Sequence, residues 1–188
     1  MTFLNHFCSE MHKVVFKDKA TAPLMKLVAL LIAVGNRLKI CDIRNFITDY
    51  VTTIGNRIYA HPRWNYATEP SPLVLHELTH VVFWSTTYAL RYLLSKKWRL
   101  YYESVCIQTE MMCFTRCRSN AYIKIKARML EGYGIRYSDA VNELAKRLHE
   151  VETNRHHPEA AKVYYLYADW QRLMEHVRLA GSAHHEDH

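Results

Sequence analysis

The sequence predicts a mainly helical (α+β) fold with one small β-hairpin, in a single domain spanning residues 1–188. Over most of the chain, apolar residues recur every three or four positions, as they do on one face of an amphipathic helix. Only residues 50–60 combine β-branched side chains with a two-residue turn signal. The chain has only five glycines and five prolines, which argues against a loop-rich protein. Its hydrophobic fraction of 49% is enough for a core.

The first fifty residues contain one strong helical signal. Residues 1–20 have no clear period and are expected to form a short helix or an arm. Residues 22–34 predict an apolar helix that begins near Pro23, because proline is favoured in the first turn. Residues 37–50 are ambiguous, although their apolar positions fit a helical face better than a strand.

The β-hairpin is predicted at residues 50–60. The β-branched segment Tyr50–Ile54 is followed by the turn signal Gly55-Asn56 and by a return strand at 57–60. A proline-containing loop at 61–71 then leads into the next helix.

The helix predicted at 72–94 contains the string His76-Glu77-Leu78-Thr79-His80. Residues four apart lie on one face of a helix, so His76 and His80 can direct two imidazole nitrogens at one metal ion. Glu77 lies beside that face, where it can hold a water on the metal and take its proton. Zinc is the usual metal for such a pair, and apolar residues around the rest of this helix predict that it is buried.

A second anomaly follows on the helix predicted at 100–117. Glu103 and Glu110 share an otherwise apolar stripe of that helix, and buried acids are costly unless they are paired or bind a metal. Further helices are predicted at 119–131, 138–151 with Ser138 as N-cap, and 158–179. The last of these is expected to bury Val163, Tyr167, Leu173 and Val177, and residues 181–188 to form a flexible tail.

These residues resemble small HExxH zinc metallopeptidases of the gluzincin type, including compact proteins found in bacteria and tailed phages. The resemblance covers the hairpin, the loop at 62–64, the HExxH helix and the segment Arg99-Leu100-Tyr101-Tyr102-Glu103. It implies a zincin-like minimal metallopeptidase core at 50–118, with helical additions at 1–49 and 119–180.

The resemblance also implies a site. Zinc would be held by His76, His80 and Glu103, with Glu77 as the general base of peptide-bond hydrolysis. The hairpin edge would bind an extended peptide or protein substrate. Glu110 is expected to support the ligands or to face the substrate, or to replace Glu103 as the third ligand, since simple antiparallel pairing of two straight helices favours it. Glu103 is preferred because the Thr86-Thr87 stretch could end the first helix early. Tyr133 is a candidate transition-state donor, and a core position is the alternative.

Two other functions remain open at this stage. The chain could be a non-catalytic, zinc-stabilised structural or virion-associated protein, or it could contact nucleic acid weakly through basic residues at 116–128, consistent with a net charge of +7. The cysteines at 106, 113 and 117 could form a soft metal site, although buried small residues are the simpler interpretation.

The apolar run at 24–34 is too short for the roughly 20 residues that span a bilayer, so no transmembrane segment is expected. Five cysteines without scaffold-like spacing predict reduced thiols and a cytoplasmic, or virion-associated, protein. The sequence does not predict the oligomeric state or identify the substrate.

Overall fold

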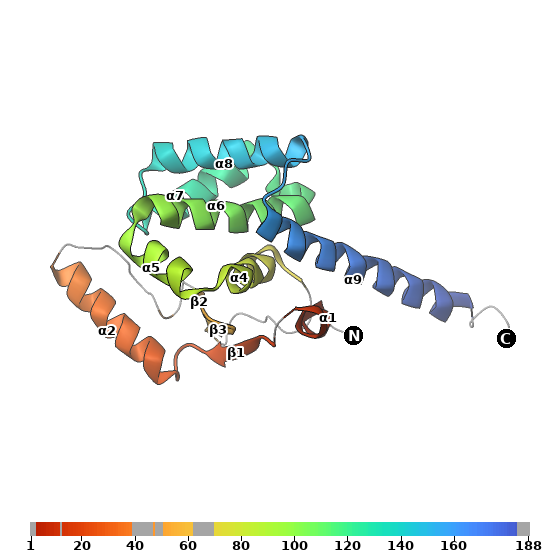
Figure 1. Ribbon diagram of the computed structural model, residues 1–188, viewed down its shortest axis with the longest axis horizontal. Helices are drawn as coiled ribbons and strands as arrows, with labels where there is room; N and C mark the ends of the chain where they lie inside the picture. Colours follow the sequence, from red (N-terminus) through yellow and green to blue (C-terminus); the bar gives the residue numbers. More distant parts are fainter. Residues whose placement is uncertain (1–2, 12, 39–46, 48–50, 62–69, 184–188) are drawn as a thin grey trace.

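The predicted fold class is confirmed by the computed structural model, which describes residues 3–11, 13–38, 47, 51–61 and 70–183 (Figure 1). That part of the chain contains eight α-helices and a small three-stranded mixed sheet. The helices are α1 (Phe3–Glu10), α2 (Pro23–Arg37), α4 (Pro72–Phe83), α5 (Thr86–Leu94), α6 (Lys96–Cys113), α7 (Asn120–Glu131), α8 (Tyr137–Glu152) and α9 (Pro158–Ala183). The strands are β1 (Val15–Asp18), β2 (Thr52–Ile54) and β3 (Arg57–Ala60).

Helix α6 is at the centre of the molecule and packs against α4, α5, α8 and α9. One apolar core lies where α6 meets α7 and α8, and a second lies where α4 meets α1, β3 and α9. Fully buried members of the two cores are Ile107, Met111, Leu130 and Leu144 in the first, and Phe7, Ile58, Leu75 and Val163 in the second. Since α4 and α6 contribute to these cores, side chains between them are shielded from water.

The hairpin is present, but it belongs to a larger sheet than the sequence predicts. Strands β2 and β3 pair antiparallel with Ile54 opposite Arg57, and Gly55 has the positive φ of 64° that the first turn position of a type II′ hairpin requires. Strand β1 pairs parallel with β3, giving the order β1-β3-β2. Residues 1–20 therefore supply a helix and a strand, and four residues are too few to show a periodic signal.

The prediction of one helix at 72–94 is wrong, because the chain turns between Phe83 and Thr86. Ser71 caps α4 by accepting a hydrogen bond from the Val74 N–H, as the Ser-Pro start predicts. Trp84 then leaves the helical conformation with ψ of 121°, and the Ser85 hydroxyl caps α5 by accepting from the Tyr88 N–H at 3.0 Å. This break changes which residues of the next helix can reach α4.

Two further boundaries differ from the prediction. Helix α6 begins at Lys96 instead of about residue 100, because Ser95 caps it by accepting from the Trp98 N–H at 3.4 Å. It ends at Cys113, and residues 115–117 form a separate 3₁₀ turn. Helix α8 has Arg136, not Ser138, at its N-cap position.

The long helix α9 is only partly packed. Val163 and Tyr167 are buried as predicted, but Leu173 and Val177 are exposed, because the second half of α9 extends beyond the body of the molecule (Figure 1). No helix in the described residues is long and apolar enough to span a membrane. The predicted helix within 37–50, most of the loop at 61–71 and the end of the tail lie outside the described residues.

Candidate metal centre

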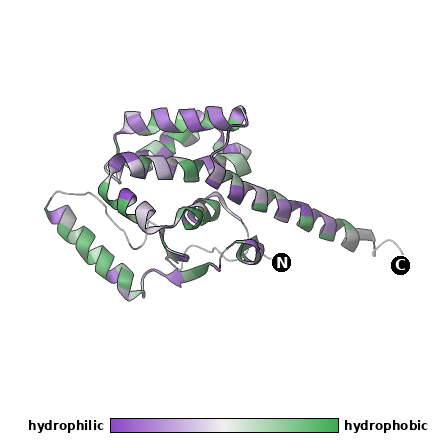
Figure 2. Ribbon diagram, viewed as in Figure 1, coloured by the Kyte–Doolittle hydropathy of each residue, from purple (hydrophilic) through white to green (hydrophobic). Residues whose placement is uncertain are grey.

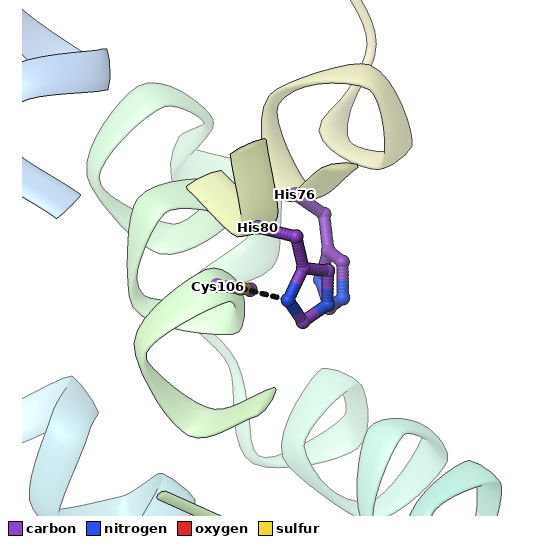
Figure 3. A group of neighbouring side chains, drawn as sticks. All are labelled: His76, His80 and Cys106. Atoms are coloured by element: carbon purple, nitrogen blue, oxygen red, sulfur yellow. Dashed lines mark hydrogen bonds between the residues drawn. The ribbon is translucent and has the colours of Figure 1, made fainter. Parts of the chain in front are cut away.

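His76 and His80 lie one turn apart on α4 and face α6, as the sequence predicts (Figure 3). Their ring centroids are 5.0 Å apart, and their exposed fractions are only 8% and 6%. Cys106, which α6 contributes, is fully buried beside them. One ligand atom from each of these three residues lies within 4.8 Å of the other two, so the group could hold a metal ion.

A buried carboxylate faces the same edge of both imidazoles. Glu103 Oε2 lies 3.2 Å from His76 Nε2, and Glu103 Oε1 lies 3.5 Å from His80 Nε2. The break after Phe83 explains how Glu103 reaches this position. A straight helix to residue 94 would have kept it far from His80, whereas here α5 turns the chain back and α6 packs against α4.

Other side chains occupy the Nδ1 atoms of both histidines. Glu110 Oε1 lies 2.6 Å from His76 Nδ1, and the Tyr88 hydroxyl lies 2.8 Å from His80 Nδ1. Cys106 Sγ also approaches His80 Nδ1, at 3.4 Å. Partners at the distal ring nitrogen fix the orientation of metal-binding histidines in known sites, and both rings have one here.

Glu110 is held in place from three sides in the interior. Besides contacting His76, it accepts a hydrogen bond from the Tyr122 hydroxyl and forms an ion pair with Lys126 Nζ at 2.8 Å. Burial by itself raises the pKa of Glu110, but Lys126 and His76 outweigh it and lower the pKa. Glu110 therefore remains an anion, and its carboxylate is engaged by His76 Nδ1, Tyr122 and Lys126.

The carboxylates of Glu103 and Glu110 favour a positive charge at the histidines. Burial lowers the pKa of His76, but hydrogen bonds and charges from Glu103 and Glu110 outweigh it and raise this pKa to about 10. Burial alone would raise the pKa of Glu103. This pKa nevertheless lies well below its usual value, because His80 and His76 stabilise the anion. A bound cation would also compensate these negative charges, so this set of donor atoms fits a divalent metal.

Two tyrosines of α5 complete the wall of the site. The Tyr92 hydroxyl donates to Glu103 Oε1, and Tyr88 contacts His80 as described above. Burial, and then the charge of Glu103, raise the pKa of Tyr92 well above its usual value; Tyr133 adds to this effect and so lies in the same neighbourhood. Tyr133 also packs against the first core, and its carbonyl accepts from Arg99 at 2.7 Å.

Glu77 is buried beside the histidines and contacts the edge of the sheet. The Thr53 hydroxyl on β2 donates to Glu77 Oε2 at 2.6 Å. On the neighbouring residue, the Thr52 hydroxyl accepts from Lys19 Nζ at 2.8 Å. Lys19 is fully buried, and burial lowers its pKa to about 7, although the charge of Glu77 opposes the change.

The structure thus brings together His76, Glu77, His80, Glu103 and Glu110, all of which the sequence singles out. Cys113 and Cys117 do not belong to the group formed with Cys106. Sequence reasoning missed five supporting side chains: Thr53, Tyr88, Tyr92, Tyr122 and Lys126. The four-residue spacing of the two tyrosines, one turn apart on α5, is the signal that could have indicated them.

Several side chains of the predicted basic segment at 116–128 make contacts within the protein. Lys126 pairs with Glu110, and the Arg118 guanidinium donates to the carbonyls of Met111 and Met112. Arg116 and Arg128 lie over the rings of Phe114 and Tyr137.

Comparison of the chain with protein-family profiles, with curated proteins and with solved structures finds no match. The resemblance to gluzincin-type peptidases therefore depends on the HExxH string and the residues around it, and no family is identified.

Proposed function

We propose that the chain binds one zinc ion through His76 Nε2, His80 Nε2 and Glu103, and that it hydrolyses peptide bonds with Glu77 as general base. The observation that supports this most directly is the orientation of the two imidazoles. Their Nε2 atoms face a single carboxylate at 3.2 and 3.5 Å, while Glu110 and Tyr88 contact their Nδ1 atoms. Two histidines and one carboxylate are the protein ligands of a common class of catalytic zinc site.

Glu103 is preferred over Cys106 as the third ligand. Cys106 Sγ approaches His80 at Nδ1, the atom that Tyr88 also contacts, and not at Nε2. Burial, together with the nearby charges of Glu103, Glu77 and Glu110, raises the pKa of Cys106 well above its usual value in the metal-free chain. A bound zinc ion would itself deprotonate a coordinating thiol, so the preference for Glu103 rests on the position of its oxygens at the two Nε2 atoms.

Glu103 is also preferred over Glu110. The Glu110 carboxylate contacts the opposite nitrogen of His76 and is shared with Lys126 and Tyr122. Seven residues separate the two acids, which places them about 10 Å apart along α6, so one metal cannot readily bind both. Glu110 instead orients His76 and makes its ring a better donor.

Zinc, when bound, would polarise the substrate carbonyl and make water acidic enough to lose a proton near neutral pH. Glu77 would accept that proton and return it to the leaving amine. Thr53 donates to Oε2 of Glu77, which holds the carboxylate in one orientation and keeps its other oxygen available for water. Strand β2, which is at the edge of the described sheet, could pair with an extended peptide near this group.

Zinc affinity in variants tests the ligand assignment. Glu103→Ala should lose zinc in competition with a chelator, whereas Cys106→Ala should retain it. In cobalt-substituted protein, the thiolate-to-metal absorption band in the near ultraviolet should be absent. A strong band that disappears in Cys106→Ala would assign the third ligand to Cys106 instead.

Peptide hydrolysis is tested by incubating the zinc-loaded protein with a mixture of unstructured peptides and identifying new termini by mass spectrometry. Glu77→Gln should bind zinc normally and produce no cleavage, because the amide cannot accept the proton. Cleavage by Glu77→Gln at the wild-type rate would remove Glu77 as the base. If the wild-type protein holds zinc but cleaves nothing, the non-catalytic, zinc-stabilised alternative is favoured.

A further inference from the structure

Helix α2 exposes a stripe of large apolar side chains that nothing in the described residues covers. Met25 is fully buried, but Leu27 and Leu31 are 54% and 62% exposed. The stripe consists of Leu24, Leu27, Leu31 and Val34, and Leu38 continues it one residue beyond the helix. The helical positions are three or four residues apart, so they lie on one face of α2. Figure 2 shows that α2 is mostly hydrophobic and lies at the side of the molecule.

A second exposed apolar group lies on α5, the helix whose other face lines the candidate metal centre. Tyr88 and Tyr92 point inward to His80 and Glu103. Leu90, Leu93 and Leu94 are exposed, Leu93 by 68% and Leu94 by 82%. One short helix thus connects the buried site to an apolar outer surface.

The charges around both groups have the same sign. No aspartate or glutamate occurs between residues 19 and 41 or between residues 78 and 102. Lys26 and Arg37 are exposed on α2. Arg91, Lys96 and Lys97 are exposed at the junction of α5 and α6. Each group of leucines is therefore flanked by cations in a stretch of chain that lacks acidic residues.

We propose that the apolar stripe of α2 and the exposed leucines of α5 bind the surface of an anionic lipid membrane. Lysine and arginine beside an apolar stripe match negatively charged headgroups, while the leucines reach the acyl boundary. Helix α2 is about 22 Å long and would lie in the plane of the interface, because it is too short to cross the hydrocarbon layer.

Charge distinguishes this partner from a second copy of the chain. A symmetric dimer through α2 would place the Lys26 and Arg37 side chains of one copy near the same side chains of the other. That arrangement opposes like charges in a protein with a net charge of +7, whereas an anionic surface offsets them. The proposal does not depend on zinc or on hydrolysis, but membrane binding through α5 would bring the candidate centre close to the lipid surface.

Flotation with vesicles tests the proposal. The wild-type protein should float with vesicles of phosphatidylcholine and phosphatidylglycerol and bind much more weakly to phosphatidylcholine alone. The double variant Leu27→Glu/Leu31→Glu should reduce the partition coefficient for the mixed vesicles at least tenfold. The matched control Leu173→Glu/Val177→Glu places the same charges on exposed residues of α9 and should bind as the wild type does.

Circular dichroism should show that both double variants retain wild-type helix content, since all four side chains are exposed. The reversal Lys26→Glu/Arg37→Glu should weaken binding to mixed vesicles without altering the apolar stripe. Wild-type protein that does not float with mixed vesicles, or that floats equally well with Leu27→Glu/Leu31→Glu, would overturn the proposal. Sedimentation showing a lipid-free dimer that Leu27→Glu/Leu31→Glu dissociates would also overturn it, in favour of a second copy.

Discussion

Replacing Glu110 with alanine tests how the interior of the site is held together. The substitution removes a fully buried carboxylate that contacts His76 at 2.6 Å and Lys126 at 2.8 Å and accepts from Tyr122. The side chain of Lys126 is only 13% exposed, so its ammonium would lose this partner in a mostly buried position.

The expected loss of stability is large. Removing one partner of a buried ion pair typically costs about 3–5 kcal/mol, because the remaining charge is not compensated. In a chain of this length, each kcal/mol corresponds to about 2–4 °C in Tm, so the metal-free variant should melt roughly 6–20 °C below the wild type. Zinc affinity should fall about 10- to 100-fold, because His76 loses the group that orients it, but binding should persist.

Thermal melting of the metal-free proteins and chelator competition measure the two effects separately. The double variant Glu110→Ala/Lys126→Met should recover much of the lost stability, since it removes the stranded charge, and it should not recover zinc affinity. Glu150→Ala is the matched control, because Glu150 pairs with the buried Arg147 at 2.9 Å on the far side of α6. It should lower stability without changing zinc affinity.

Complete loss of zinc in Glu110→Ala, together with unchanged affinity in Glu103→Ala, would refute this reasoning and make Glu110 the ligand. Equal melting of Glu110→Ala and the wild type would show that the buried network contributes little to stability.

Three further predictions concern the metal and the sheet edge. Removing zinc from the zinc-loaded protein should lower Tm, because the metal binds the folded state only; an unchanged melting curve after verified removal would contradict this. Thr53→Val should reduce turnover and leave zinc affinity unchanged, whereas Thr53→Ser should retain most of the turnover; equal rates in all three proteins would exclude a role for this hydroxyl. Lys19→Met should stabilise the protein at neutral pH by roughly 1–3 kcal/mol, because burial lowers the lysine pKa from 10.5 to about 7 and the lost hydrogen bond to Thr52 offsets part of that gain. The unfolded chain binds the extra proton between these two values, so the contribution of Lys19 to stability rises from pH 7 towards pH 10.5, and the difference in stability between Lys19→Met and the wild type should shrink over that range.

The sequence was most informative where spacing alone determines geometry. His76 and His80 had to share a face of a helix, and the Ser-Pro pair before that helix predicted its start. The acids at 103 and 110 stood out because an apolar stripe does not tolerate unpaired carboxylates. These signals depend on local structure, and the structure brings Glu103 to both histidines and Glu110 to His76.

What the sequence could not supply was the path of the chain between these helices. The turn at Trp84-Ser85 has no glycine or proline, so the apolar pattern predicts a helix to residue 94, and only the Thr86-Thr87 pair indicates that the helix could end early. That turn determines whether Glu103 or Glu110 lies opposite the Nε2 atoms. Strand β1 was missed for a related reason, because four residues that pair with a distant strand leave no periodic signal.

The support for the site was also invisible at the level of sequence. The sequence predicts that Lys126 belongs to an exposed basic segment, yet it pairs with a buried acid sixteen residues earlier in the chain. Thr53 looked like an ordinary β-branched strand residue, and only the packing of β2 against α4 brings it to Glu77. Such contacts depend on tertiary packing, which no short sequence pattern encodes.

The most direct test of the proposed centre is the metal content of protein purified without added metal and without a histidine-affinity step. A variant lacking residues 184–188 should be measured in parallel, because His184, His185 and His188 could bind metal adventitiously. We predict about one zinc per chain in both proteins and almost none in Glu103→Ala. Metal-free wild-type protein that does not take up zinc when it is supplied, or undiminished zinc in Glu103→Ala, would contradict the proposed centre.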